Sequence, residues 1–163
     1  MANNSKITWY ILEDEEYIQD DEYYLGSFSP DSEIQLKVQV WNNRYGKNNV
    51  ESIPNARLAI YFDSIEDSML LEYCTVSIND NNFTKIPVMF GKGIIDIGLL
   101  SGNSNNGMDI IDNIYNFKNI SISFKGFPTN LKNGIKYEAY ISISCMEWFI
   151  ARKVRSVFEI YRQ

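Results

Sequence analysis

Carboxylates are the side chains of this chain that could act as catalytic acids and bases. The sequence contains no histidine, which removes the Ser–His and Cys–His nucleophile pairs, the usual general base at neutral pH and the commonest zinc ligand. Two carboxyl groups that flank a glycosidic bond can hydrolyse it without another catalytic group. The candidates for such a glycosidase-like enzyme are Asp63, Glu66, Asp67 and Asp96. Because an acidic protein carries many carboxylates without a catalytic role, we expect instead that the chain is not an enzyme.

The other reactive residues do not indicate cofactor chemistry. Cys74 and Cys145 each lie in an alternating apolar run, which favours buried, reduced thiols over a disulfide between sheets. The loop 101–107 contains glycines but lacks the Lys-Ser/Thr ending of a phosphate-binding loop. Residues 13–22 include seven Asp or Glu, yet they lack the alternating oxygen ligands and the glycine of a calcium loop. We therefore predict no cofactor and no bound metal.

A binding role is indicated by the run Trp41, Asn42, Asn43, Arg44 and Tyr45. Aromatic faces beside amide and guanidinium donors can stack on a sugar ring and hydrogen-bond its hydroxyl groups. The run is therefore a candidate site for a glycan or a protein partner. In the alternative, a neighbouring strand or loop covers Trp41, because single aromatic residues near the surface are common.

The stretch 32–41 must position this run. Its residues alternate between apolar and polar, which is typical of a strand with one buried and one solvated face. The inward residues are Ile34, Leu36, Val38 and Val40, and the outward residues are Gln35, Lys37, Gln39 and Trp41. The pattern predicts a strand that ends with Trp41 on the face in contact with water.

Similar alternation recurs along the chain, with turn residues between the apolar runs. Further strands are expected at 6–12, 55–62, 72–78, 83–90, 94–100, 119–124, 137–145 and 154–160. Pro87 argues that its strand lies at an edge or contains a bulge, and short helical turns are expected at 63–68 and 108–115. About nine strands without alternating helices are typical of an antiparallel β-sandwich, immunoglobulin-like or jelly-roll-like. We expect one domain, residues 1–163.

Charge and composition limit the kinds of partner that the chain can bind. The net charge of −6 and the pI of about 4.7 oppose binding to nucleic acid, which needs clustered basic residues. No run approaches the ~18 apolar residues that span a bilayer, and the first residues lack a signal-peptide pattern. We expect no membrane partner and a protein that is cytoplasmic as synthesised. Frequent Asn, Ile, Lys and Tyr, whose codons are A/T-rich, indicate a low-GC bacterium or one of its viruses.

Two segments of opposite charge lie far apart in the sequence. The acidic arm, residues 13–31, is expected to be a loop, and the basic segment 149–163 a strand or a helix, with a strand favoured. Contact between these segments in different copies would form a homo-oligomer with apolar residues inside a charged rim. The candidate contact residues are Tyr17, Ile18, Tyr23, Tyr24, Arg152, Lys153 and Arg155. In the alternatives, both segments are solvated, or the arm folds back on the C-terminal segment of its own chain.

The run 36–46 (LKVQVWNNRYG), followed by 55–62 (NARLAIYF), resembles the opening of immunoglobulin-like adhesion modules of bacterial surfaces and phage tails. In those modules a strand ending in Asn-Asn or Asn-Gly precedes a loop and an A-x-L-x-I-x-F strand. The resemblance implies a non-enzymatic structural or interaction module that acts through protein partners. A cytoplasmic start favours an accessory virion or tail-associated protein of a phage or prophage, because virions assemble in the cytosol.

Overall fold

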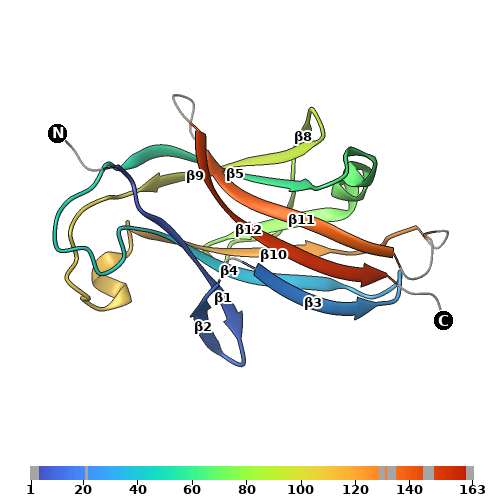
Figure 1. Cartoon of the computed structure of the whole chain (residues 1–163), viewed down its shortest axis with the longest axis horizontal. Coiled ribbons are helices and arrows are strands. Elements are labelled where there is room, and N and C mark those ends of the chain that lie inside the picture. Colours follow the sequence, from blue (N-terminus) through green and yellow to red (C-terminus); the bar gives the residue numbers. More distant parts are fainter. Residues whose placement is uncertain (1–3, 21, 129–130, 132–134, 145–148, 161–163) are drawn as a thin grey trace.

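Two six-stranded sheets, packed face to face, make up the described part of the chain (Figure 1). The computed structural model describes residues 4–20, 22–128, 131, 135–144 and 149–160, and of 135, 144 and 149–160 it describes the backbone alone. The strands are β1 (Ile7–Glu13), β2 (Glu16–Gln19), β3 (Glu22–Phe28), β4 (Ile34–Asn42), β5 (Ile53–Phe62), β6 (Cys74–Ile78), β7 (Thr84–Lys85), β8 (Val88–Met89), β9 (Lys92–Leu100), β10 (Phe117–Phe124), β11 (Ile135–Ser144) and β12 (Phe149–Ile160). The predicted antiparallel β-sandwich is confirmed. Its immunoglobulin-like or jelly-roll-like subtype stays a prediction.

The first sheet has the strand order β2-β1-β4-β10-β6-β7, and all its described pairs are antiparallel. β4 lies between β1 and β10, so that Val38 is opposite Ile11 on one side and Ile120 on the other. All three side chains are buried. The alternating apolar residues of β4 face the other sheet, as predicted from their spacing.

The second sheet has the order β3-β12-β11-β5-β9-β8. Near its middle, β5 and β11 place Ile60 opposite Ile141. β3 runs parallel to β12, and this is the exception to antiparallel pairing among the described strands. The chain reaches this position by crossing from β2 in the first sheet to β3 in the second, then back to β4 in the first.

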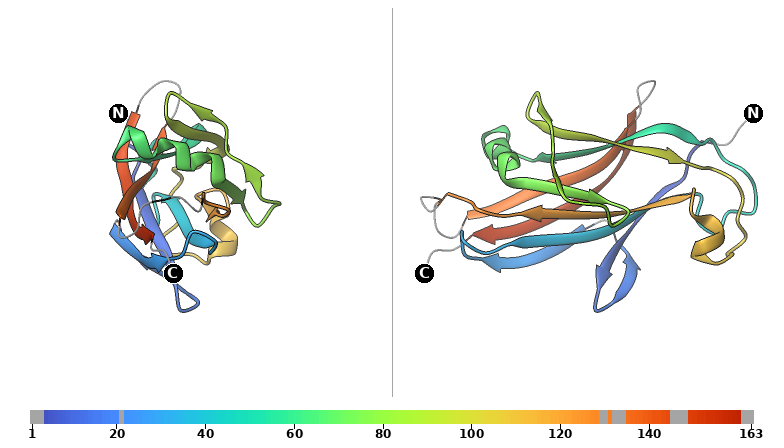
Figure 2. Two further views of the ribbon diagram at one scale, coloured as in Figure 1. Left: turned by 90° about the vertical axis from the view of Figure 1, so that its right-hand side faces the viewer. Right: turned by 180° about the vertical axis from the view of Figure 1, so that it is seen from behind.

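The main hydrophobic core lies between the two sheets. Figure 2 shows these sheets from the end and from behind. Val38 and Val40 from the first sheet and Leu58 and Ile60 from the second are almost completely buried. Each such side chain contributes about 1.5–3 kcal/mol to folding when it is fully buried. The core therefore makes a large apolar contribution to holding the two sheets together.

The acidic arm is not a loop, and that prediction is wrong. Its residues form β2 and β3, and Asp14 and Glu15 make the tight turn of a β1–β2 hairpin with φ angles of 50° and 67°. Two-residue hairpin turns of this type need positive φ at both central positions, which Asp tolerates better than most residues. Periodicity did not predict these two strands, because most of their apolar residues are consecutive (Tyr17-Ile18 and Tyr23-Tyr24-Leu25) and do not alternate with polar ones.

The other local predictions hold with changes in length. The C-terminal segment is the strand β12, and the two helical turns are the 3-10 helices η1 (Ile65–Tyr73) and η2 (Ile110–Asn113). The predicted strand 83–90 divides near Pro87 into two short strands. β7 lies at the edge of the first sheet, and β8 lies at the edge of the second. No helix in the described ranges is long and apolar enough to cross a membrane.

Candidate functional site

An aromatic layer covers part of the outer face of the first sheet. It consists of Tyr10, Trp41 and Phe117, with the half-buried Tyr17 of β2 packed against them. Trp41 and Phe117 are cross-strand neighbours, and their rings stack with centroids 4.7 Å apart. Only 2% of Trp41 is exposed. The prediction that Trp41 faces water is therefore wrong, and the alternative in which neighbouring strands cover it is correct.

The outer face also buries Gln39, which was predicted to face water. Its exposed fraction is 2%. Nε1 of Trp41 donates to Oε1 of Gln39 at 2.6 Å, and Nε2 of Gln39 donates to Oδ1 of Asn119 at 2.8 Å. These bonds offset the cost of removing polar groups from water. Alternation identifies the face on which a residue lies, but it does not show which side chains from other strands cover that face.

Asn42 and Asn43 brace the backbone, and both side chains are buried. Nδ2 of Asn42 donates to the carbonyl oxygens of Glu51 and Leu100 at 3.0 and 3.3 Å. Nδ2 of Asn43 donates to the carbonyl oxygen of Gly102 at 2.9 Å. Asn43 has a φ of 60°, a left-handed conformation that Asn adopts more readily than most residues. Both side chains position loops, so the prediction that Asn42 contacts a ligand is wrong, and Asn43 keeps only the small part of its surface that lines a hollow.

Three further asparagines hold the facing loop, residues 101–116. Nδ2 of Asn116 donates to the carbonyl oxygen of Asn42 at 3.2 Å, and Nδ2 of Asn105 donates to that of Asn43 at 2.6 Å. Nδ2 of Asn113 donates to two carbonyl oxygens of its own loop, at 2.7 and 2.8 Å. Loops 42–52 and 101–116 therefore form one braced unit, which we call the loop end.

Main-chain hydrogen bonds join the same two loops. The amide of Val50 donates to the carbonyl of Gly102, and the amide of Asn105 donates to that of Gly46, both at 2.8 Å. Glycine is required at position 102, because a Cβ atom there would overlap the carbonyl of Val50. The polar loop thus has a fixed path despite its low hydrophobicity.

Arg44 and Tyr45 are the residues of the predicted run that reach the surface. The guanidinium carbon of Arg44 lies 4.2 Å from the ring centre of Tyr10 and 4.8 Å from the ring centres of Trp41 and Tyr45. Such cation–π contacts fix the guanidinium group over the rings. Tyr45 is 59% exposed. It is therefore accessible to a ligand, and its role in binding stays a prediction.

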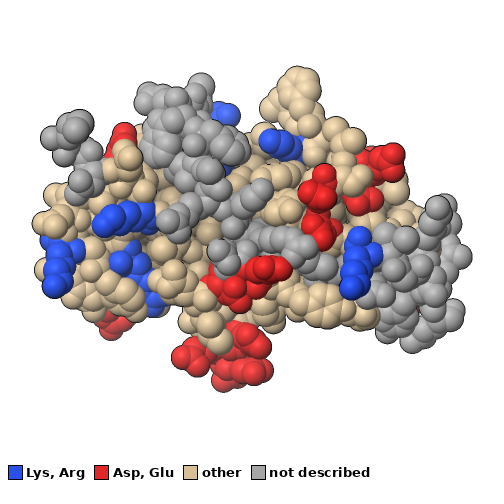
Figure 3. All heavy atoms as spheres, in the orientation of Figure 1, with Lys and Arg blue, Asp and Glu red and all other residues tan. Residues whose placement is uncertain are grey.

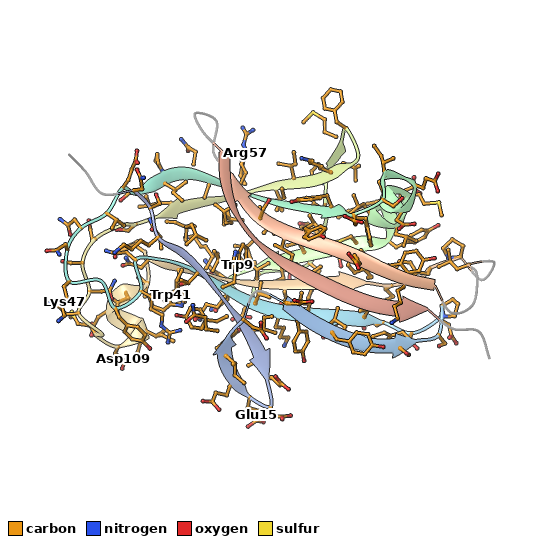
Figure 4. The ribbon with its side chains drawn as sticks, viewed as in Figure 1. Trp9, Glu15, Trp41, Lys47, Arg57 and Asp109 are labelled. Atoms are coloured by element: carbon orange, nitrogen blue, oxygen red, sulfur yellow. The ribbon has the colours of Figure 1, made fainter. Side chains whose placement is uncertain are left out.

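Two hollows flank the ridge that Arg44 and Tyr45 form. One has a volume of about 260 Å³ and extends along the second loop past Asn105 and Asp109. The other has a volume of about 360 Å³ and is lined by residues 43–48, Val50 and Lys6. In Figure 4, Trp41, Lys47 and Asp109 lie at this same end of the sandwich.

Large apolar side chains are exposed on the rim of the loop end. They are Tyr45, Met108, Ile110, Ile111, Ile114 and Tyr115. Ile111 on η2 is the most exposed of them, at 74%. From the sequence, residues 108–115 were expected only to form a helical turn. The missed signal was the number of apolar residues directly after a polar loop.

The carboxylates considered for catalysis lie on two separate elements. Asp63, Glu66 and Asp67 occur at and just before the start of η1, and burial, followed by the charges of Glu66 and Asp63, raises the pKa of Asp67. Asp96 lies on β9, where it forms an ion pair with Arg57. Nε of Arg57 lies 3.1 Å from Oδ1 of Asp96. The hollow beside Asp96, about 470 Å³, has no second carboxylate among its described lining residues. The structure therefore does not pair Asp96 with another of these acids.

Cys74 is a buried free thiol, as predicted. Burial raises the pKa of this thiol from 9.0 to about 12. A thiol that stays protonated at neutral pH is a poor nucleophile and a poor metal ligand. Cys145 lies outside the described residues.

The aromatic and apolar residues proposed for self-assembly differ in exposure. Ile18 and Tyr24 are exposed, whereas Tyr17 and Tyr23 are half-buried. Burial, and to a lesser extent the charge of Asp80, raises the pKa of Tyr17, in agreement with its packing on the aromatic layer. Ile18 and Tyr24 therefore remain available for contact with another molecule.

The basic candidates Arg152, Lys153 and Arg155 belong to β12, and their side chains lie outside the described part of the structure. The backbone of β12 pairs with β3, with Arg155 opposite Glu22. The second half of the acidic arm thus folds along the C-terminal segment of its own chain, which was one of the alternatives. The first half forms the β1–β2 hairpin, which protrudes from the sandwich (Figure 1).

Comparison with known proteins finds no matching family model and no matching curated protein. Among solved structures, the chain is similar to a family 123 glycoside hydrolase from Clostridium perfringens, with 11% identity, a TM-score of 0.50 and 99% of this chain covered. It spans 28% of the length of that hydrolase chain. It is also similar to the third cohesin ScaC of Acetivibrio cellulolyticus, with 16% identity, a TM-score of 0.41 and coverage of 86% of this chain and 96% of the cohesin. These comparisons bear on the fold and not on the function.

Proposed function

We propose that this chain is a non-enzymatic β-sandwich module that binds a protein partner through its loop end. The observation that carries the proposal is the exposure of six large apolar side chains on loops that buried asparagines hold in place. Exposed apolar groups that gather at one place mark interaction sites more often than isolated ones do. Loops that are already ordered also lose little conformational entropy on binding, which favours affinity.

The residue types of the loop end suit a protein interface. Tyrosine, methionine and arginine are enriched in interfaces, and this surface presents Tyr45, Tyr115, Met108 and Arg44. Recognition residues are often carried on loops that a rigid scaffold positions. We expect the apolar rim to be buried against the partner. Arg44 would then fix the orientation of the partner.

The absence of enzymatic activity is part of the proposal. It is supported by the lack of histidine in the sequence, by the ion pair that engages Asp96, and by the neutral state that burial favours for the Cys74 thiol. An interaction module of this kind needs no cofactor and can act in the cytoplasm, where we expect the chain to be synthesised.

Site-specific photo-cross-linking in the source organism tests the proposed surface. A photoreactive amino acid at position 111 or 115 should give the same protein adduct, because both side chains are exposed on the rim. The matched control is a probe at Lys125, which is exposed and follows the opposite end of β10. Adducts that form equally from position 125, or none from the loop end, would contradict the proposal.

A finer form of the proposal makes the chain an accessory virion or tail-associated protein of a phage or prophage from a low-GC bacterium. It is supported by the sequence resemblance of residues 36–62 and by the A/T-rich residue usage. Mass spectrometry of purified particles tests this form. Absence from every particle preparation would remove it and leave the interaction module standing.

A glycan is the second candidate ligand, because the 260 Å³ hollow combines the Tyr45 ring with polar groups. Among these, Oδ1 of Asn105 is buried and has no hydrogen-bond partner within the described residues. A sugar hydroxyl could donate to this oxygen while the ring stacks on Tyr45. A glycan array compares wild type with Tyr45→Ala: a signal lost in the variant supports the glycan, and no signal from either protein removes it.

A further inference from the structure

Arg44 carries a positive charge that no described residue neutralises. Its guanidinium group is held over Tyr10, Trp41 and Tyr45, and it forms no ion pair or side-chain hydrogen bond with the part of the chain that the structure describes. A guanidinium presents five N–H donors in one plane, a geometry that matches a carboxylate in bidentate fashion. Contact with ring faces fixes this plane and leaves the N–H edges for an anion.

The hollow next to Arg44 is basic. Lys6 and Lys47 line the same 360 Å³ space, and its described lining contains no acidic residue. Neither lysine forms an ion pair among the described residues. Three cations around one concave surface raise the local concentration of anionic groups. The hollow therefore favours an acidic ligand over a neutral one.

The chain itself contains an acidic element of suitable shape. Glu13, Asp14, Glu15 and Glu16 form the tip of the β1–β2 hairpin, and all four are exposed. Within the described residues none of them forms an ion pair. Figure 3 shows these carboxylates as an acidic knob that protrudes from the sandwich, and basic side chains at the end that carries the loops. A tight turn presents the four charges on a short, ordered element.

We propose that the acidic tip of the β1–β2 hairpin of one copy binds in the basic hollow at Arg44 of a second copy. This inference rests on the proposed function, because it names one partner for the loop end. The hairpin and Arg44 flank the same aromatic layer: Tyr17 of β2 packs against the layer, and Arg44 lies over Tyr10. One two-fold axis can therefore form both contacts at once, which gives a closed dimer.

Charge reversal in the full-length chain tests this contact by sedimentation velocity. Wild type should dimerise at low salt and dissociate near 1 M salt, where the screening length is about 3 Å. Arg44→Glu, or Glu13→Lys together with Glu16→Lys, should weaken association at least about tenfold, because the first replaces one of the three cations of the hollow by an anion and the second brings the tip from four negative charges to a net charge of zero. Glu13 and Glu16 lie opposite each other in register and outside the positive-φ turn, so their reversal leaves the turn intact.

A mixture of the two reversed variants separates this contact from a general effect of charge. In the mixed dimer the acidic tip of one chain meets the unchanged hollow at Arg44 of the other, and the two lysines of the substituted tip meet Glu at position 44, so the mixture should associate more strongly than either variant alone. Lys37→Glu is the matched control, because Lys37 is exposed on the outer face of β4. If Arg44→Glu loses its folded circular dichroism signal, Arg44→Gln replaces it.

Three results would overturn the dimer: a wild-type monomer at all salt and protein concentrations, reversed variants that associate like wild type, or a mixture that stays monomeric. The adducts from positions 111 and 115 are independent of these results. Loss of the dimer would therefore leave the proposed function intact, whereas a dimer without these adducts would limit binding at the loop end to the hollow at Arg44.

Discussion

Trp41 donates its indole N–H to the side chain of Gln39, two residues earlier on the same strand, at 2.6 Å. The bond belongs to the aromatic layer outside the first sheet, which acts as a second, smaller core. β4 is consequently buried on both faces from Val38 to Asn42. The loop that carries Arg44 and Tyr45 begins where this strand ends.

Replacing Gln39 with Ala should lower the free energy of unfolding by about 1–3 kcal/mol, because the Trp41 N–H and the Asn119 side chain would lose their buried partner. Urea unfolding measures the change. Lys37→Ala, on the same face but exposed, should change stability by less than about 0.5 kcal/mol. Equal effects of the two variants would show that the outer layer is not a core.

Asn116→Ala should loosen the loop end. Its side chain donates to the carbonyl oxygens of Asn42, Ser101 and Asn103, so the variant removes a buried donor from these acceptors at a cost of about 1–3 kcal/mol. Amide hydrogen exchange should speed up in residues 101–116. Asn103→Ala, at an exposed position, is the control, and unchanged exchange in Asn116→Ala would show that the side chain does not brace the loop.

Cys74 should make stability depend on pH in the alkaline range. Burial raises the pKa of its thiol from 9.0 to about 12, so the folded chain keeps a proton that the unfolded chain loses. The stability is fully present below pH 9 and should fall as the pH rises from about 9 towards 12. The difference between wild type and Cys74→Ala in urea unfolding isolates this effect from the tyrosines.

The same burial should protect Cys74 from a thiol reagent in the folded protein. In a Cys145→Ser background, labelling at pH 8 should require urea, because the thiolate is the reactive form and the folded thiol stays protonated. Rapid labelling without denaturant would place Cys74 at the surface and contradict the core described above.

Phe90 should be dispensable for folding. It is 94% exposed and has a φ of 52°, a conformation that is unfavourable for an aromatic residue. Phe90→Asn should therefore leave stability unchanged or raise it by a few tenths of a kcal/mol. Ile86→Asn, in the nearby core, should be strongly destabilising. A loss of stability in Phe90→Asn would mean that the ring packs against the chain.

Periodicity was sufficient to predict the sandwich and its main core. The alternation around Val38 and Val40 identifies the inner face of β4, because a half-buried strand repeats every two residues. The same rule failed for Gln39 and Trp41, since a strand sequence does not reveal which rings from β1 and β10 cover its outer face. It also failed for β2, where the two apolar residues, Tyr17 and Ile18, are adjacent and do not alternate with polar ones.

Sequence patterns predicted only part of the candidate site. Arg44 and Tyr45 were identified, and both line the hollows. The bracing role of Asn42, Asn43 and Asn116 was not, because their amides bond to backbone carbonyls of distant loops. Such bonds follow no sequence period, so only the three-dimensional path of the chain reveals them.

If the loop end is ordered before a partner binds, ¹⁵N relaxation of the free protein should show this order. The bracing hydrogen bonds predict order parameters of about 0.85 for residues 42–52 and 101–116, similar to those of the strands. Order parameters below about 0.6 in these loops would contradict a preformed binding surface.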